Sequence, residues 1–121
     1  MILVTSNKAK RLLFISYIDV VTPEELEENR AEMEALLAEL PADFRLVGDF
    51  SSLTTMEDDC EAIIGRMMET IDQHGVELVV RVMPDATKDI GMNILTLFHY
   101  SQRPRVATCA NLTEAARALA L

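Results

Sequence analysis

The sequence predicts an α/β fold in which β-strands and α-helices alternate along the chain. Three observations indicate this class: β-branched runs recur between segments with helical spacing, capping residues precede several of those segments, and turn residues are few. The predicted order is ββαβαβαβα, which implies an about five-stranded mixed, mostly parallel sheet with right-handed crossovers. The chain has 121 residues with only four Gly and four Pro, so residues 1–121 are expected to form a single domain.

The N-terminal half is expected to contain three strands and two helices. Thr22, Pro23 and Glu25 supply an N-cap, a first helical residue and a capping-box partner, so a helix begins there and ends before Pro41. Gly75 ends the second helix at its C′ position. The strands are predicted at residues 1–5, 11–18 and 44–50, and Thr54 or Thr55 caps a second helix with the buried stripe Cys60, Ile63, Ile64, Met67, Met68 and Ile71.

The C-terminal half repeats the alternation. A β-branched run predicts a strand over residues 76–83, a turn follows at 84–87, and a third helix spans 89–100. A short last strand is expected at residues 104–109. Asn111 and Glu114 then cap a final Ala-rich helix.

Alternation within the central strands predicts how the helices are distributed. A parallel strand that is covered on both faces reads as a continuous apolar run, and neither central strand does so. In the strand at residues 44–50, one side carries Phe44, Leu46 and Phe50. In the strand at residues 76–83, one side carries Val76, Leu78, Val80 and Val82. The four helices are therefore expected to pack mainly on one face of the sheet, and the second, partly open face would carry Arg45, Glu77, Arg81 and Arg105.

Composition excludes several classes of partner. There are 20 Asp and Glu against 11 Lys and Arg, for a net charge of −9, so neither nucleic acid nor an anionic membrane is an expected partner. No apolar run approaches the roughly 18–20 residues of a membrane span, and the N-terminus lacks a signal-peptide pattern. Cys60 and Cys109 are expected to be buried free thiols of a cytoplasmic protein.

No pattern of catalytic or metal-binding residues stands out. The two histidines, His74 and His99, are expected to be structural, because nothing in the sequence pairs them with a nucleophile. There is no Gly-x-Ser-x-Gly, glycine-rich phosphate loop or CxxC pair, so no enzyme activity, cofactor or metal is expected. Ligands of parallel sheets gather at the carboxyl ends of the strands, an edge that here would carry Asp49, Ser51, Ser52, Thr54, Thr55, Glu57, Asp58, Asp85, Thr87, Lys88, Asp89, Thr108 and Asn111.

The element order resembles the STAS domain of anti-sigma-factor antagonists, especially the stand-alone bacterial branch called STAS/SEC14-like. Three segments carry the resemblance: Leu46-Val-Gly-Asp-Phe-Ser-Ser-Leu-Thr-Thr-Met-Glu-Asp-Asp-Cys60, Val80-Arg-Val-Met-Pro-Asp85 and Phe98-His-Tyr100. It covers essentially the whole chain, as a single STAS-like domain. It implies a right-handed βα superhelix with most helices on one side of the sheet.

The chain departs from this family where the second helix should start. STAS antagonists usually carry Asp-Ser-Ser-Gly there, with a serine that the partner kinase phosphorylates, whereas this chain has Glu57-Asp58-Asp59-Cys60. These carboxylates are compatible either with a well-capped helix or with a surface that holds a permanent phosphate-like charge. By resemblance, the partner surface would consist of Ser51, Ser52, Thr55, Glu57, Asp58 and Asp59.

The predicted third helix is apolar on nearly every side, which leaves three interpretations open. It packs in the core, it forms a self-association surface, or it lines an apolar ligand cavity. The residues of the last two interpretations are Met67, Met68, Met92, Leu95 and Phe98, with Met83 nearby. An acidic helix at residues 22–40 and basic strand ends could also meet across a homodimer axis.

The leading hypothesis is a non-enzymatic regulatory or protein-interaction module that binds a protein partner, forms a homodimer, or does both. The alternative is a SEC14-like carrier or sensor of a small apolar ligand.

Overall fold

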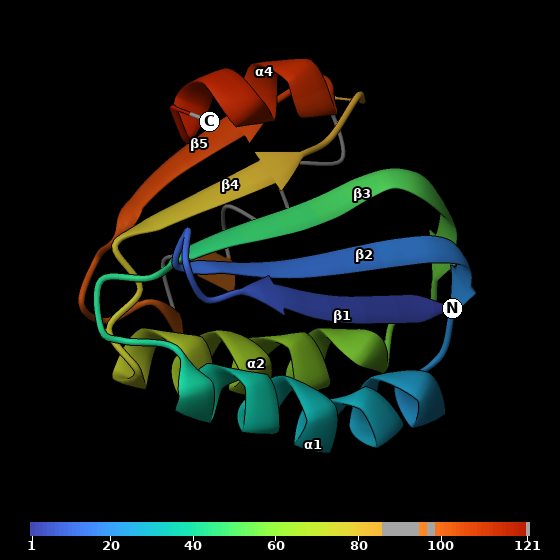
Figure 1. Ribbon diagram of the computed structural model, residues 1–121. Coiled ribbons are helices and arrows are strands. Elements are labelled where there is room, and N and C mark those ends of the chain that lie inside the picture. Colours follow the sequence, from blue (N-terminus) through green and yellow to red (C-terminus); the bar gives the residue numbers. More distant parts are fainter. Residues whose placement is uncertain (86–94, 97–98, 121) are drawn as a thin grey trace.

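Five strands form one sheet in the spatial order β1-β2-β3-β4-β5, as Figure 1 shows. The computed structural model describes residues 1–85, 95–96 and 99–120. β1 and β2 are antiparallel and the other neighbouring strands are parallel, which confirms the predicted mixed, mostly parallel sheet. The elements are β1 (Ile2–Asn7), β2 (Leu12–Val21), α1 (Pro23–Glu39), β3 (Arg45–Met56), α2 (Cys60–Gln73), β4 (Leu78–Val82), β5 (Arg105–Cys109) and α4 (Leu112–Ala118).

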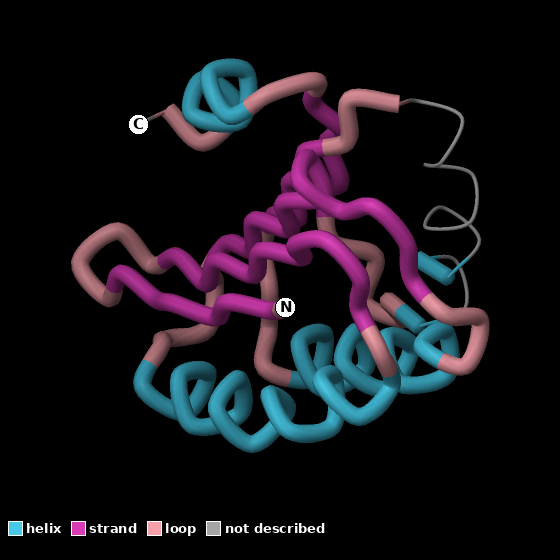
Figure 2. Tube along the Cα trace, turned by 90° about the vertical axis from the view of Figure 1, so that its right-hand side faces the viewer, coloured by secondary structure: helices cyan, strands magenta, loops and turns pink. Residues whose placement is uncertain are grey.

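The helices form two layers around the sheet. α1 and α2 lie side by side on one face, and α4 lies on the opposite face over β4 and β5 (Figures 1 and 2). This arrangement confirms the predicted α/β class, with three helices in the described part of the chain instead of four. Of the expected third helix at residues 89–100, the structure describes Leu95, Thr96, His99 and Tyr100, and the first three are helical.

Two apolar cores follow from these layers. The larger one lies between the sheet and the α1–α2 pair, and its fully buried side chains include Leu13, Ile15, Leu26, Met33 and Phe44. The smaller one lies under α4 and contains Val47, Leu78, Val80, Val82, Cys109, Ala115 and Leu119. β4 is therefore buried on both faces, which stabilises the centre of the sheet through the hydrophobic effect.

The predicted faces of β4 were wrong in one respect. Arg81 was expected on the partly open face, but it is 2% exposed and lies on the α1–α2 side with Val79 and Met83. Its guanidinium donates a hydrogen bond to the Thr96 hydroxyl at 3.0 Å. The physical reason is that α4 covers the other face of β4, so the apolar side of this strand faces α4 and the side with Arg81 faces the larger core.

The open part of the second face lies over β1 and β2, beyond the reach of α4. Leu3 is 49% exposed there, whereas Phe14 is half-buried because it packs against the smaller core under α4. Arg45, which was also expected on this face, lies at the margin of α4. Its guanidinium donates hydrogen bonds to the backbone oxygens of Leu119 and Lys10, and so links the end of α4 to the β1–β2 turn.

Local capping signals fix three helix ends as predicted. The Thr22 hydroxyl accepts a hydrogen bond from the Glu25 amide at 3.3 Å, and the Asn111 side chain accepts one from the Glu114 amide at 2.9 Å. Gly75 follows α2 with φ of +94°, in the left-handed region that favours glycine. The expected cap of α2 was wrong, because Thr54 and Thr55 belong to β3 and α2 begins only at Cys60.

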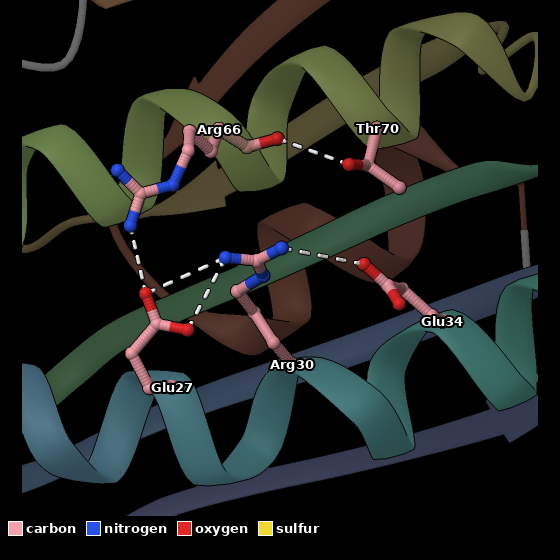
Figure 3. A network of polar contacts seen from close by, with 5 residues as sticks. All are labelled: Glu27, Arg30, Glu34, Arg66 and Thr70. Atoms are coloured by element: carbon pink, nitrogen blue, oxygen red, sulfur yellow. Dashed lines mark hydrogen bonds and ion pairs between the residues drawn. The ribbon is translucent and has the colours of Figure 1, made fainter.

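Exposed ion pairs connect α1 and α2 on their outer surface (Figure 3). The Glu27 carboxylate accepts hydrogen bonds from Arg66 at 2.7 Å and from Arg30 at 3.2 Å, and Arg30 also lies 3.8 Å from Glu34. All four side chains are at least 31% exposed, so solvent and salt screen these pairs. Apolar packing beneath them therefore stabilises the α1–α2 layer more than these charges do.

No helix in the described part of the chain has both the length and the apolar character needed to cross a lipid bilayer.

Candidate functional site

The candidate site forms where β3 continues after β4 has ended. β3 pairs with β4 only as far as Asp49 opposite Val82, but it pairs with β2 up to Met56 opposite Val21, seven residues later. β4 ends at Val82, the Met83 amide still donates to the Cys109 carbonyl at 2.8 Å, and the chain bends at Pro84. β3 curves toward the start of α2 in this stretch (Figure 1), so a gap opens between it and the exit of β4.

Two β-bulges produce the bend in β3. Phe50 and Ser51 lie opposite the single residue Tyr17, and Thr54 is a second extra residue opposite the Asp19–Val20 step. Bulges add twist and bend the strand that carries the extra residue, and they occur often beside functional sites.

Side-chain contacts fix the first bulge. The Asp49 carboxylate accepts hydrogen bonds from the Ser51 amide at 2.9 Å and from the Ser51 hydroxyl at 2.6 Å. On the other face of the strand, the rings of Phe50 and Tyr17 stack with centroids 4.5 Å apart and an interplanar angle of 9°. The curvature of β3 is therefore held by polar contacts on one side and by aromatic packing on the other.

A cavity of about 510 Å³ occupies the gap. This volume lies within the roughly 300–1,000 Å³ of small-molecule sites. The cavity is bounded by β3, the start of α2, the exit of β4 and Leu95, and its lining residues are Phe50, Ser51, Leu53, Met56, Glu57, Asp58, Glu61, Ile64, Met83, Pro84, Asp85 and Leu95.

The lining separates into an apolar interior and an acidic mouth. Phe50, Ile64 and Met83 are buried, and Leu53, Met56 and Leu95 are half-buried beside them. The exposed carboxylates of Glu57, Asp58 and Glu61 lie at the mouth. Among the described lining residues there is no lysine, arginine or histidine. A molecule that enters the cavity would therefore meet negative charge first and apolar surface next.

Backbone hydrogen bonds hold the acidic turn before α2. The Glu57 amide donates to the Val21 carbonyl at 3.4 Å, while the Glu57 and Asp58 carbonyls accept from Cys60 and Glu61 at 3.0 and 3.1 Å. Carboxylates in this position interact favourably with the positive end of the helix dipole. The turn therefore presents its acidic side chains to solvent from a fixed backbone.

The two cysteines are not poised as nucleophiles. Burial raises the pKa of the Cys60 thiol, and the negative charge of Glu57 raises it further. Burial also raises the pKa of Cys109, with Glu114 adding to the effect. Both thiols are free and buried, as expected from the sequence, and both stay protonated at neutral pH.

The histidines lie away from the cavity lining. His74 Nε2 is 2.9 Å from the Leu40 carbonyl oxygen, and its ring contacts Phe44 edge-on. His99 Nδ1 is 2.7 Å from the Glu69 carboxylate. Within residues 1–85, 95–96 and 99–120, no three or more His, Cys, Asp or Glu side chains are grouped to hold a metal ion.

The residues predicted for partner binding fall within residues 51–59 but occupy different positions in the structure. Ser51, Glu57 and Asp58 line the cavity mouth. Ser52 and Thr55 are exposed on β3, and Asp59 is the exposed N-cap residue of α2. All six residues are exposed within residues 51–59, interrupted by the half-buried Leu53 and Met56, and their role in partner binding stays a prediction.

The residues predicted for an apolar surface divide into three groups. Leu95 lines the cavity. Met67 and Met68 are 3% and 4% exposed in the larger core, where they border a small void of about 30 Å³, with room for a water molecule or two. Met92 and Phe98 lie outside the described residues. Sequence reasoning missed Leu53, Met56 and Glu61. The apolar character of Leu53 and Met56 within a polar stretch was the only signal for these two residues.

The order of elements and the site on β3 and α2 define a STAS-like α/β fold. No protein-family profile and no curated protein matches this chain in sequence. Solved structures do match it. An uncharacterised protein of the DUF3478 family with a SpoIIAA-like fold, from Shewanella loihica PV-4, has a TM-score of 0.74 at 12% identity over 98% of this chain and 92% of that chain.

Two structures of SpoIIAA show the same similarity. The anti-sigma factor antagonist SpoIIAA in its unphosphorylated form has a TM-score of 0.65 at 16% identity, over 99% of this chain and 98% of that chain. SpoIIAA in its phosphorylated form, described as a cell fate determinant of Bacillus, has a TM-score of 0.59 at 12% identity, over 98% and 99%. At these identities the similarity establishes the fold, which confirms the STAS-like architecture expected from the sequence.

Proposed function

We propose that this chain is a non-enzymatic regulatory module that binds a protein partner through the exposed surface at the start of α2. The observation that carries the proposal is the position of Glu57-Asp58-Asp59, a rigid acidic turn directly before a helix in a fold shared with an anti-sigma factor antagonist. The proposed contact surface consists of Ser51, Ser52, Thr55, Glu57, Asp58 and Asp59.

The acidic turn suggests how such a module would differ from phosphorylated antagonists. It contains no hydroxyl group, so it cannot be switched by phosphorylation of a serine at that position. Its three carboxylates instead give the helix start a constant negative charge. A partner that recognises it would present a basic surface, because complementary charge steers association and selects among partners.

Charge reversal tests this proposal. The double variant Asp58→Lys/Asp59→Lys should lose the specific proteins that the parent chain captures from a lysate of its source organism. A matched control is Glu28→Lys/Glu32→Lys, which reverses two exposed carboxylates on α1. The proposal is contradicted if quantitative mass spectrometry finds the same proteins with both variants and with the parent, while circular dichroism shows all three folded.

A second copy of the chain is a further proposed partner. The exposed face of α1 carries six glutamates, and the β1–β2 turn carries Lys8, Lys10 and Arg11, all exposed, so two copies could pair through opposite charge. Sedimentation at tens of micromolar protein and low salt should then give a mass of two chains. A mass of one chain under these conditions would remove the homodimer from the proposal.

A second candidate function is favoured by the cavity itself. An apolar interior formed by Phe50, Ile64 and Met83, with a volume of about 510 Å³, suits a carrier or sensor of a small apolar ligand. Native mass spectrometry of protein purified without denaturation would test it. An added mass of a few hundred daltons that organic extraction removes supports a carrier, and the bare chain mass after gentle purification counts against it.

A further inference from the structure

We propose that the cavity between β3 and α2 selects a small cationic amphiphile, a molecule with an apolar body and a protonated amine. This inference rests on the second candidate function, ligand binding, and adds the chemical class of the ligand. The juxtaposition of an apolar interior with an acidic mouth in one cavity carries it.

The interior defines the apolar body of the ligand. Phe50, Ile64 and Met83 are each less than 10% exposed, and the half-buried Leu53 and Met56 of the curved part of β3 line the same cavity. An alkyl or aromatic group placed there removes apolar surface from water on both sides.

The mouth defines the charge of the ligand. The side-chain carboxylates of Glu57, Asp58 and Glu61 take part in no ion pair and accept no side-chain hydrogen bond within the described part of the chain. They come from the turn before α2 and from its first turn, so all three face the same opening. The net charge of −9 on the whole chain strengthens their attraction for a cation.

These charges discriminate among ligands that share one apolar body. An amine gains attraction at the mouth, an alcohol gains none, and a carboxylate meets like charge and is disfavoured. A fatty acid is therefore the wrong class of ligand for this site, although its alkyl chain fits the interior. The volume suits a small molecule, which favours this occupant over a segment of a partner protein.

Three probes with one alkyl chain test the inference: octylamine, octan-1-ol and octanoate, titrated into the full chain at neutral pH and low salt. Two-dimensional NMR of labelled protein would follow the amides of residues 50–61. We expect octylamine to bind about tenfold more tightly than octanol and octanoate to bind most weakly. The advantage of octylamine should shrink as the salt concentration rises, because salt screens exposed charges.

Matched variants locate the charge effect. Asp58→Asn/Glu61→Gln leaves one mouth carboxylate, Glu57, and should remove most of the advantage of octylamine over octanol while leaving the affinity for octanol unchanged. The control Glu28→Gln/Glu32→Gln removes the same number of charges from α1, far from the mouth, and should change neither affinity by more than about twofold.

The outcomes separate this inference from the carrier function. Octanol binding that equals octylamine binding, or tighter binding of octanoate, overturns the cationic class and leaves an apolar carrier. The same loss of octylamine affinity in the α1 control also overturns it, because only net charge would then matter. Failure of all three probes overturns both proposals. A capped peptide Leu-Lys-Leu that binds more tightly than octylamine assigns the cavity to a segment of a partner and overturns the small-molecule class.

Discussion

Gly65, in the middle of α2, lies directly against the imidazole of His99. A Cβ atom added at Gly65 would be 2.6 Å from His99 Nε2 and 2.8 Å from Cε1, which is closer than carbon and nitrogen atoms can approach. The other ring nitrogen of His99 lies 2.7 Å from Glu69, one turn further along α2. Glycine within a helix costs about 0.5–1 kcal/mol of stability relative to alanine. α2 is therefore less stable than it would be with alanine at residue 65, but the missing Cβ leaves room for the His99 ring.

The Gly65–His99 contact predicts a change of sign in a double-mutant cycle. In the parent chain, Gly65→Ala should destabilise the fold or leave it unchanged, because the new methyl group displaces His99 from Glu69. In the His99→Ala variant, the same substitution should stabilise by about 0.5–1 kcal/mol. Urea unfolding of the four proteins measures both effects. An equal gain from Gly65→Ala in both backgrounds would show that the ring does not occupy this position.

The bulge at Ser51 should depend on the Asp49 carboxylate. Asp49→Ala leaves the Ser51 amide without its acceptor in a half-buried position, and should lower the free energy of unfolding by about 1–3 kcal/mol. Asp49→Asn keeps one carbonyl oxygen and should cost less. Chemical denaturation compares the two variants, and equal losses for Asn and Ala would mean that the hydrogen bonds do not stabilise the bulge.

The end of α2 should not tolerate a side chain at residue 75. Gly75 has φ of +94°, and a Cβ atom there would lie 3.4 Å from Ala42 Cβ, an ordinary contact, so the cost of Gly75→Ala comes from the backbone. That cost is expected to be about 1–2 kcal/mol. Gly75→Asn should lose less, because asparagine adopts left-handed conformations more readily. Thermal unfolding can rank the three proteins, and an unchanged Gly75→Ala variant would be inconsistent with the described turn.

Stability should fall at alkaline pH because of the two tyrosines, Tyr17 and Tyr100. Burial raises the pKa of both phenols above the ordinary value of 10, and for Tyr100 the neighbouring charges have a smaller effect on the pKa. The unfolded chain releases these protons near pH 10, so the contribution is complete below that pH and is lost as pH rises toward the folded pKa values. The loss is about 1.4 kcal/mol per tyrosine for each pH unit above 10.

Unfolding by urea at a series of pH values measures this slope, and absorbance at 295 nm follows the phenolates directly. The double variant Tyr17→Phe/Tyr100→Phe serves as the control, because its stability should fall less steeply over the same range. Phenolate absorbance that appears near pH 10 while the protein is still folded would contradict the burial of both rings.

Local signals were sufficient to predict most of the architecture. The caps at Thr22 and Asn111 involve partners only three residues away, and the C′ position of Gly75 depends on a single backbone angle. Because these signals are local, all three helix ends could be predicted from the sequence. The alternation of elements then leaves few topologies for the sheet. These features do not depend on what distant parts of the chain do.

Features that depend on distant partners were not predictable. Ser51 to Thr55 read as a loop and a helix cap because they are polar, but pairing with β2 keeps them in β3, where threonine also fits well. Likewise, alternation shows that Arg81 and Val80 face opposite ways, but only the position of α4 decides which of them faces which core. The cavity needs both the extra length of β3 and the exit of β4, so the sequence indicated single lining residues such as Met83 and Leu95 but not the position of the cavity.

The last residues of β3 pair with β2 alone, because the pairing of β3 with β4 ends at Asp49, seven residues before the end of β3 at Met56. Their amides should exchange with deuterium faster than those of the five-stranded part of the sheet, since opening one strand pair breaks fewer contacts than opening the centre. Local opening of this end of β3 would widen the cavity while the rest of the domain keeps its structure. A bound molecule would enter and leave through this local opening, and its residence time would be set by β2 and β3 rather than by the global stability of the fold.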